Sequence, residues 1–312
     1  MIANLKGVVR RTLNVGLAFG FLACLAGNVL AQGSLDCGKY STESTNAGTT
    51  CHRVGIVPWF LGINDVWETE LRLGVGLDAV RFGFGLPSSY NTNLLMRPYQ
   101  IAEAISQLDV MAHASYLTTI VGFADLNRNT FGWDFRNGVG SLTLSADAQR
   151  AVALDSISAS VVYKYMSKGS VVSETTAPII FLDQASVRWS AIITETPRDQ
   201  QSQPDSTITS FAVANLSPDP QAVVIQVYDE AGHLSASGKT TELGGSDSGD
   251  VYANTLANTL GINLPAIVHG LPATAPVFRG TIVFEGEKNG LIAPVVFRFN
   301  GSAVTSVPVR AE

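Results

Sequence analysis

The sequence contains few charged residues, and fewer of them are basic than acidic. Of its 312 residues, 15% are charged, and 26 acidic residues outnumber 20 basic ones. A chain with so few Lys and Arg has no basic stripe to neutralise phosphates, so we expect no nucleic-acid partner. Because 46% of the residues are hydrophobic, the composition also excludes a disordered chain, a collagen-like repeat and a coiled coil.

Residues 1–31 have the pattern of an export signal. Three basic residues precede the uncharged apolar stretch 13–30, and Val29-Leu30-Ala31 is a small-residue cleavage site. Cleavage starts the mature chain at Gln32 and removes three positive charges, which takes the net charge from -6 to -9. A membrane anchor and a lipoprotein attached through Cys24 are the alternatives. After cleavage we expect no integral membrane segment, and a secreted, periplasmic or cell-surface protein, either released or attached.

Cysteine is nearly absent from the predicted mature chain, in which only Cys37 and Cys51 remain. An exported protein meets an oxidising environment, so these two cysteines are predicted to form a disulfide. The alternative is a metal site or a reactive thiol, supported only by His52 next to Cys51. Two sulfurs and one adjacent imidazole do not make a tetrahedral metal site by their spacing.

An internal repeat with a period near 140 residues is the strongest pattern in the chain. Three segments recur in the same order with offsets of 143, 140 and 134 residues, as two copies of one domain do after insertions and deletions in loops. Chance similarity between strands is the alternative. The matched pairs are 78–84 with 221–227, 140–144 with 280–284, and 161–165 with 295–299.

Each matched segment alternates at period two, which predicts strands with one buried face and one solvent face. In the last pair, the predicted inward sets are Val161, Tyr163 and Tyr165 in the first copy and Val295, Phe297 and Phe299 in the second. Turn residues separate the segments, which favours antiparallel connections. Four further strands are predicted at 67–73, 187–193, 211–215 and 223–228.

These patterns predict an all-β fold of two tandem antiparallel β-sandwich domains. Each domain is expected to carry one short helix at one end, because 98–108 has an apolar helical face and 250–260 begins with an Asp cap. The predicted division is a signal peptide at 1–31, a disulfide-clipped segment at 32–56, a first sandwich at 57–194, a linker at 195–205 and a second sandwich at 206–312.

The strand sequences also resemble a known group of proteins. The motifs are Trp-x-Thr-x-Leu-x-Leu at 67–73, Phe278-Arg279-Gly280 and Arg298-Phe299-Asn300. With them, the chain resembles exported bacterial proteins, including acidobacterial ones, that are built from tandem immunoglobulin-like β-sandwich repeats. The likeness covers most of 57–309 and is better in the second copy. It implies the immunoglobulin-like fold, and it brings no established reaction or catalytic residue.

A calcium loop is one candidate site. Asp125, Asn127 and Asn129 have the oxygen-ligand spacing that begins such a loop, and Asp134 can contribute later. However, the sixth position lacks Gly and the twelfth is Arg136 where a Glu is needed. The alternative is a polar loop whose side chains bond their own backbone. Ca2+ is the one cofactor for which the sequence offers a candidate site.

Aromatic residues in loop-like stretches are the other candidate site. Trp59, Phe60, Phe131 and Trp133 are predicted to lie outside regular strands, where exposed rings can stack on a sugar.

The sequence identifies no catalytic residue. Glu68 and Glu70 are close enough to suggest the acid pair of a glycosidase, but they alternate with apolar residues and most simply form the outward face of a strand.

We therefore expect a non-catalytic exported β-sandwich protein that acts in binding, adhesion or as a structural spacer at or outside the cell surface. The alternative is a carbohydrate-binding protein or an ancillary domain of a glycan-degrading system, and a hydrolase is less expected. Possible partners are a surface protein or a polysaccharide, and no pattern sets the oligomeric state.

Overall fold

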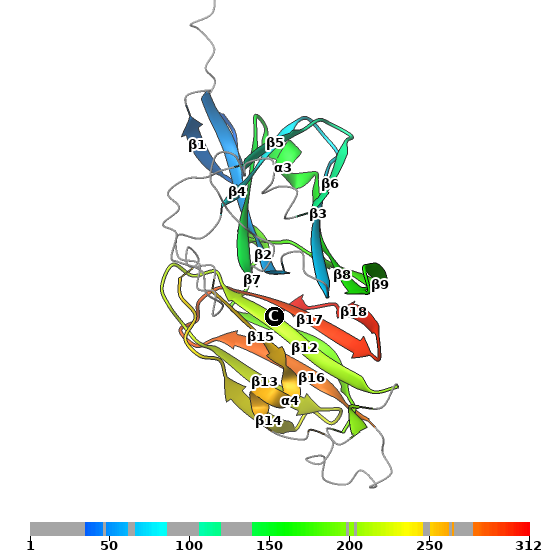
Figure 1. The fold of residues 1–312 in the computed structure, drawn as a ribbon. Helices are drawn as coiled ribbons and strands as arrows, with labels where there is room; N and C mark the ends of the chain where they lie inside the picture. Colours follow the sequence, from blue (N-terminus) through cyan, green and yellow to red (C-terminus); the bar gives the residue numbers. More distant parts are fainter. Residues whose placement is uncertain are drawn as a thin grey trace, which may run out of the picture. The chain divides into compact units, whose positions relative to one another are not determined.

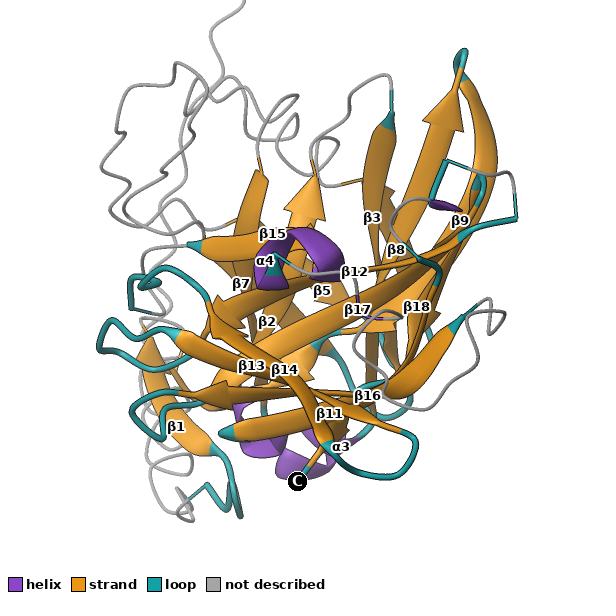
Figure 2. Cartoon of the chain, turned by 90° about the horizontal axis from the view of Figure 1, so that it is seen from below, coloured by secondary structure: helices purple, strands orange, loops and turns teal. Residues whose placement is uncertain are grey.

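The structure of the protein is a computed structural model, whose described strands lie between Ser41 and Ala311 (Figure 1). In the part of the chain that the structure describes, nearly every regular element is a β-strand (Figure 2), and the strand pairs are antiparallel. The all-β prediction is therefore confirmed. The structure describes residues 35–45, 48–61, 66–85, 106–119, 139–197, 200–202, 205–245, 250–261, 264 and 277–312.

The N-terminal half of the described chain forms two sheets. Its elements are β1 (Ser41–Thr45), β2 (Gly48–Leu61), β3 (Trp67–Val75), β4 (Val80–Gly85), β5 (Ser106–Val110), β6 (Ser115–Thr119), β7 (Val139–Ala148), α3 (Ala151–Asp155), β8 (Ile157–Ser167), β9 (Ser170–Pro178), β10 (Ile180–Phe181) and the 3-10 turn η1 (Leu182–Gln184). One sheet has the order β1-β2-β7-β4-β5, with β10 paired to β2, and the other has the order β6-β3-β8-β9. Both sheets contribute large buried side chains, which form the core of this half.

The C-terminal half also forms two sheets. Its elements are β11 (Arg188–Glu195), β12 (Thr207–Asn215), β13 (Val223–Asp229), β14 (Leu234–Lys239), β15 (Val251–Thr255), α4 (Leu256–Leu260), β16 (Phe278–Gly286), β17 (Ile292–Asn300), β18 (Ala303–Val307) and β19 (Arg310–Ala311). The sheets have the orders β14-β13-β16-β11-β19 and β15-β12-β17-β18. One apolar cluster includes side chains from both sheets, so they pack as a sandwich.

The two halves share one strand order. When β2 to β9 are matched in sequence with β11 to β18, the order β5-β4-β7-β2 corresponds to β14-β13-β16-β11, and β6-β3-β8-β9 corresponds to β15-β12-β17-β18. The three recurring segments fall on β4 with β13, β7 with β16, and β8 with β17. Each recurring pair thus occupies corresponding positions, although duplication as the origin of the halves stays a prediction.

The strand order differs from that of an immunoglobulin domain. In a constant-type immunoglobulin domain, the first strand lies in the same sheet as the second. Here β11 lies with β16 and β13, whereas β12 lies in the other sheet, and β2 and β3 are separated in the same way. The antiparallel sandwich is observed, and the immunoglobulin-like arrangement is not confirmed.

The inward face predicted for β17 is wrong. Val296 belongs to the core of the C-terminal sandwich together with Phe211 and Val213 of β12. Phe297 lies on the opposite face of β17, where its ring contacts Tyr163 of the N-terminal half at 4.9 Å between centroids. Both faces of β17 are apolar and buried, so alternation alone does not identify which face meets its own core.

Aromatic side chains join the two halves of the chain. Between ring centroids, Phe297 lies 5.4 Å from Trp59 and 4.9 Å from Tyr163, and Phe299 lies 6.0 Å from Trp67. Tyr163 also donates a hydrogen bond to the Trp59 carbonyl oxygen at 2.7 Å. Aromatic residues of the two recurring segments therefore meet in one group, which we call the junction cluster: Trp59, Trp67, Tyr163, Tyr165, Phe297 and Phe299.

Edge strands β9 and β18 are also bonded to each other. The main-chain N–H of Val304 donates to Oγ of Ser173 at 2.8 Å, and that of Ser306 donates to Oγ1 of Thr175 at 2.6 Å. Side chains of one half thereby satisfy part of the open edge of the other, which protects it from pairing with other chains.

The structure places the predicted boundary between the two domains differently. Strand 187–193 was assigned to the first domain, but β11 pairs with β16 along its whole length, so it belongs to the C-terminal sheets. The predicted linker at 195–205 therefore connects two strands of one sandwich.

The helix predicted at 250–260 is half strand, because β15 fills its first part and only Leu256–Leu260 is helical, capped by Thr255. The helix predicted at 98–108 lies largely outside the described residues, and its last residues belong to β5.

Candidate functional site

A groove of about 650 Å3 lies on the outer face of the sheet formed by β13, β16 and β11. Alternation along β11 directs Ala191 and Ile193 into the core, so Ile192 points outward, and it is 77% exposed. Tyr228 lines the groove from β13, with its hydroxyl 3.2 Å from Oε1 of Gln226. An aromatic ring and an exposed aliphatic side chain thus lie in one open groove.

Glycine at the floor of the groove brings two strands close together. A Cβ on Gly280 would collide with the carbonyl oxygen of Tyr228 and with the ring of Phe278. Any larger residue at this position would therefore displace β13 from β16 and move Tyr228.

The charged residues of the groove differ in how far they are already paired. Arg188 forms ion pairs with Glu285 at 2.8 Å and Glu312 at 2.7 Å. Within the described parts of the chain, neither Arg279 nor Glu230 has a hydrogen-bond or ion-pair partner of its side chain. One cation and one anion are therefore available to a ligand in the groove.

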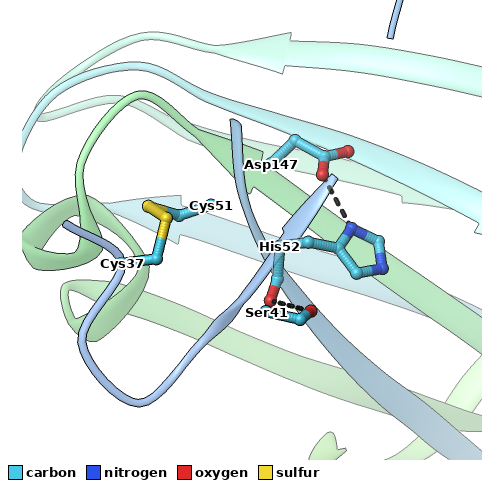
Figure 3. Close-up of a disulfide and its surroundings, with 5 residues drawn as sticks. All are labelled: Cys37, Ser41, Cys51, His52 and Asp147. Carbon is cyan, nitrogen blue, oxygen red and sulfur yellow. Dashed lines mark hydrogen bonds and ion pairs between the residues drawn. A yellow bond between two sulfur atoms is a disulfide. The ribbon is translucent and has the colours of Figure 1, made fainter. Parts of the chain in front are cut away.

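The predicted disulfide is present between Cys37 and Cys51, with the two Cα atoms 5.2 Å apart. Cys51 and its neighbour His52 project to opposite sides of β2, as alternate residues of a strand do (Figure 3). Cys51 is fully buried, so its sulfur faces the interior and His52 faces outward.

Three polar side chains converge on the outer side of this strand. Nδ1 of His52 lies 2.7 Å from Oδ1 of Asp147 and 2.8 Å from Oε2 of Glu43. Figure 3 shows the His52 ring turned toward Asp147. The hydrogen bond to Asp147 is the main cause that raises the pKa of the His52 imidazole, with burial opposing it. We call Glu43, His52 and Asp147 the His52 cluster. Asp147 follows His52 by 95 residues and Glu43 precedes it by 9, so no local sequence pattern reveals the cluster.

On the inner side of β2, a buried arginine closes the end of the N-terminal sandwich. Arg53 donates two hydrogen bonds to Asp183, at 2.8 and 3.0 Å, and one to the Leu154 carbonyl oxygen at 3.0 Å. Its guanidinium carbon lies 3.8 Å from the ring centroid of Phe181. The free-energy cost of burying the Arg53 charge is compensated by its bidentate pairing with Asp183 and its stacking on the Phe181 ring.

A second buried charge lies at the end of β11. Glu195 accepts hydrogen bonds from the Thr209 main-chain N–H at 2.6 Å and from Gln201 at 2.9 Å. No cation lies within ion-pair distance in the described segments. Burial raises the pKa of the Glu195 carboxyl to about 7.

The predicted aromatic platform is not formed by its two described members. Phe60 is fully buried and cannot stack on a ligand. Trp59 packs in the junction cluster, against Tyr163 and Phe297. Both residues lie in β2 and not in a loop, because that strand is longer than its sequence pattern indicated. The other predicted members, Phe131 and Trp133, lie outside the described residues, as do all four predicted calcium ligands: Asp125, Asn127, Asn129 and Asp134.

Glu68 and Glu70 lie on one face of β3, as predicted, but Glu70 is buried and not exposed to solvent. Lys164, on the neighbouring strand, forms ion pairs with both carboxylates. One lysine across the sheet is therefore shared by two carboxylates, which it pairs with but does not fully neutralise.

No protein-family model and no curated protein matches this chain. No helix in the described residues is both long and apolar enough to cross a membrane.

Proposed function

We propose that this is a non-catalytic exported protein that binds an extracellular polymer through the groove between β13, β16 and β11. The observation that carries the proposal is the combination of exposed Ile192, the Tyr228 ring and unpaired Arg279 in that groove. Ile192 and the Tyr228 ring line the same groove, so an exposed aliphatic and an aromatic side chain are presented together, as on interaction surfaces.

The ligand class we favour is a polysaccharide that contains acidic sugars. The groove is shallow and open, so it suits a chain that passes across it. Tyr228 can stack on a sugar ring, and Arg279 can pair with a carboxylate of the sugar. Glu230 and Thr281 add an acceptor and a hydroxyl for sugar hydroxyl groups.

Export is part of the proposal. The disulfide supports it, because disulfides persist in oxidising compartments and are rare in the cytosol. We propose that residues 1–31 direct export and are removed, and that the two halves arose by duplication of one sandwich. Sequencing the N-terminus of the protein recovered from its host tests the first of these statements, since a start other than Gln32 contradicts the predicted cleavage.

A structural spacer is the second candidate function. The junction cluster and the bonds between β9 and β18 favour it, because they hold both halves in contact. A spacer needs no ligand, so the binding measurement below separates the two functions.

Affinity electrophoresis of the mature protein in gels containing neutral or uronate-rich polysaccharides tests the binding proposal. We expect retardation by the uronate-rich polymers and about tenfold weaker binding of Tyr228→Ala, equivalent to about 1.4 kcal/mol. Arg279→Ala should weaken binding to acidic polymers alone, whereas Arg72→Ala, an exposed arginine of β3, should leave it unchanged. Equal mobility in all gels would refute polysaccharide binding and leave the spacer function.

A further inference from the structure

We propose that Glu43, His52 and Asp147 bind a divalent transition-metal ion of the zinc type. This inference is independent of the groove, which lies in the other half of the chain. The three side chains come from β1, β2 and β7, which are neighbours in one sheet.

The geometry of the donor atoms is close to that of a metal site. One nitrogen and one oxygen from each carboxylate all lie within 4.8 Å of one another. At zinc–ligand distances of 2.0–2.1 Å, the ligands of a tetrahedral ion are about 3.4 Å apart. The distances from His52 Nδ1, 2.7 and 2.8 Å, need to grow by only about 0.6 Å, which small side-chain rotations supply.

The chemistry of the donors selects the class of ion. An imidazole nitrogen suits zinc, copper and nickel, whereas calcium and magnesium prefer oxygen ligands throughout. Two carboxylates balance the double charge of the ion. Glu43 is the most exposed of the three, at 47% for its side chain, so water has access to a fourth coordination position.

An unsatisfied hydroxyl next to the cluster is a separate observation. Oγ1 of Thr50 is buried and has no hydrogen-bond partner in the described structure. Thr50 is directly opposite Glu43 in the β1–β2 register and lies on the same face as His52, two residues along β2. A buried polar atom without a partner indicates an ion or water that completes the site.

The backbone holds these ligands in place. His52 and Asp147 are direct cross-strand partners, and the disulfide fixes the residue preceding His52 to Cys37. A metal site with its ligands on paired strands loses little freedom on binding. Arg81 of β4 is the cross-strand partner of Asp147 on its other side, so a metal ion and this cation compete for the carboxylate.

The same three groups also form a plain ion triplet, with a protonated imidazole between two carboxylates. The triplet requires no metal, so the two arrangements differ in what zinc does. Metal binding to the folded state raises its stability with the logarithm of free zinc at concentrations above Kd, whereas a triplet alone gives no such dependence.

Isothermal titration of the full mature chain with zinc ions tests the proposal. We expect one ion per chain, a rise in Tm with zinc, and at least tenfold weaker binding for His52→Ala and Asp147→Asn. Calcium and magnesium should give no rise. The matched control is His233→Ala, because His233 also lies beside a carboxylate, Asp229 at 3.4 Å, but has only that one.

Two outcomes overturn the metal site. One is zinc binding that is undetectable at millimolar concentration. The other is binding that His233→Ala removes and Asp147→Asn does not. Glu43→Gln, in an exposed strand, provides a third variant that keeps the fold if His52→Ala is poorly folded, and unchanged zinc affinity in it would remove Glu43 from the site. Cobalt substitution gives a readout of geometry, since a tetrahedral ion with these ligands produces intense visible absorption bands.

Discussion

Replacement of Phe297 by alanine tests whether the two halves of the chain are coupled through the junction cluster. Phe297 is 1% exposed and contacts Tyr163 and Trp59 with ring centroids 4.9 and 5.4 Å away. Removal of a buried Phe side chain costs about 3–5 kcal/mol. Since these contacts reach across to the N-terminal half, we expect Phe297→Ala to lower the stability of both halves together.

The coupling energy follows from a double-mutant cycle. Aromatic pairs contribute about 0.5–1.5 kcal/mol beyond their buried area, so the cycle of Phe297→Ala with Tyr163→Leu should give a coupling energy of about 1 kcal/mol. Phe284→Ala is the matched control. Phe284 is as buried as Phe297, but it packs in the core of the C-terminal sandwich against Phe211 at 5.2 Å, so its coupling to Tyr163 should be within about 0.5 kcal/mol of zero.

Urea denaturation monitored by tryptophan fluorescence and by circular dichroism measures the loss of stability and the coupling energy. Trp59 and Trp67 report on the junction cluster, and Trp189 reports on the C-terminal core. Coupling through the junction cluster is refuted if Phe297→Ala shifts the Trp189 signal and leaves the transition reported by Trp59 and Trp67 unchanged, or if Phe284 and Phe297 couple equally to Tyr163.

Three further predictions concern buried groups at the ends of the sandwiches. Joint replacement of Cys37 and Cys51 by serine should lower the free energy of unfolding by about 3 kcal/mol in the chain-entropy model, for a loop of this length, and reductant should destabilise only the unreplaced protein in urea titrations. Asp183→Asn should cost about 3 kcal/mol because it leaves the Arg53 guanidinium buried without its carboxylate, and adding Arg53→Met should restore part of the loss in the same assay. The Glu195 carboxyl ionises at pH 4.5 when unfolded but near 7 when folded, so the free energy of unfolding should fall by about 3 kcal/mol as pH rises between these values. Glu195→Gln should show no such fall, and an equal pH dependence of Tm in both proteins contradicts this assignment.

The sequence predicts some of the strands and turns, whereas β15 lies where a helix is expected and β2 extends over residues expected in a loop. Period-two alternation located β3, β12, β13 and β17, because each strand has at least one apolar face that must be buried. The turns at Lys168-Gly169 and Asn300-Gly301 have positive φ at Lys168, Gly169 and Gly301, as tight hairpins require. These are local properties of the chain, so one sequence predicts them.

The sheet to which a strand belongs is not a local property. β11 reads like any half-buried strand, and its partner β16 begins more than 80 residues further on. The His52 cluster depends on the same kind of information, since the pairing of His52 with Asp147 is set by the register of β2 on β7. The number of cysteines did predict the disulfide, because the predicted mature chain keeps two of the three and two cysteines allow one pairing.

The junction cluster also explains why the groove lies where it does. A sandwich has two outer faces, and in the C-terminal half the outer face of β12 and β17 is occupied by the N-terminal half through Phe297 and Phe299. The opposite outer face, formed by β13, β16 and β11, carries Ile192 in water and the groove beside it. In the N-terminal half, the matching sheet carries the His52 cluster, whose side chains come from β1, β2 and β7. Two sandwiches with one strand order therefore carry different groups on their outer faces, the groove with Ile192 and Tyr228 in one and the His52 cluster in the other, so we expect the groove and the His52 cluster to respond separately to mutation.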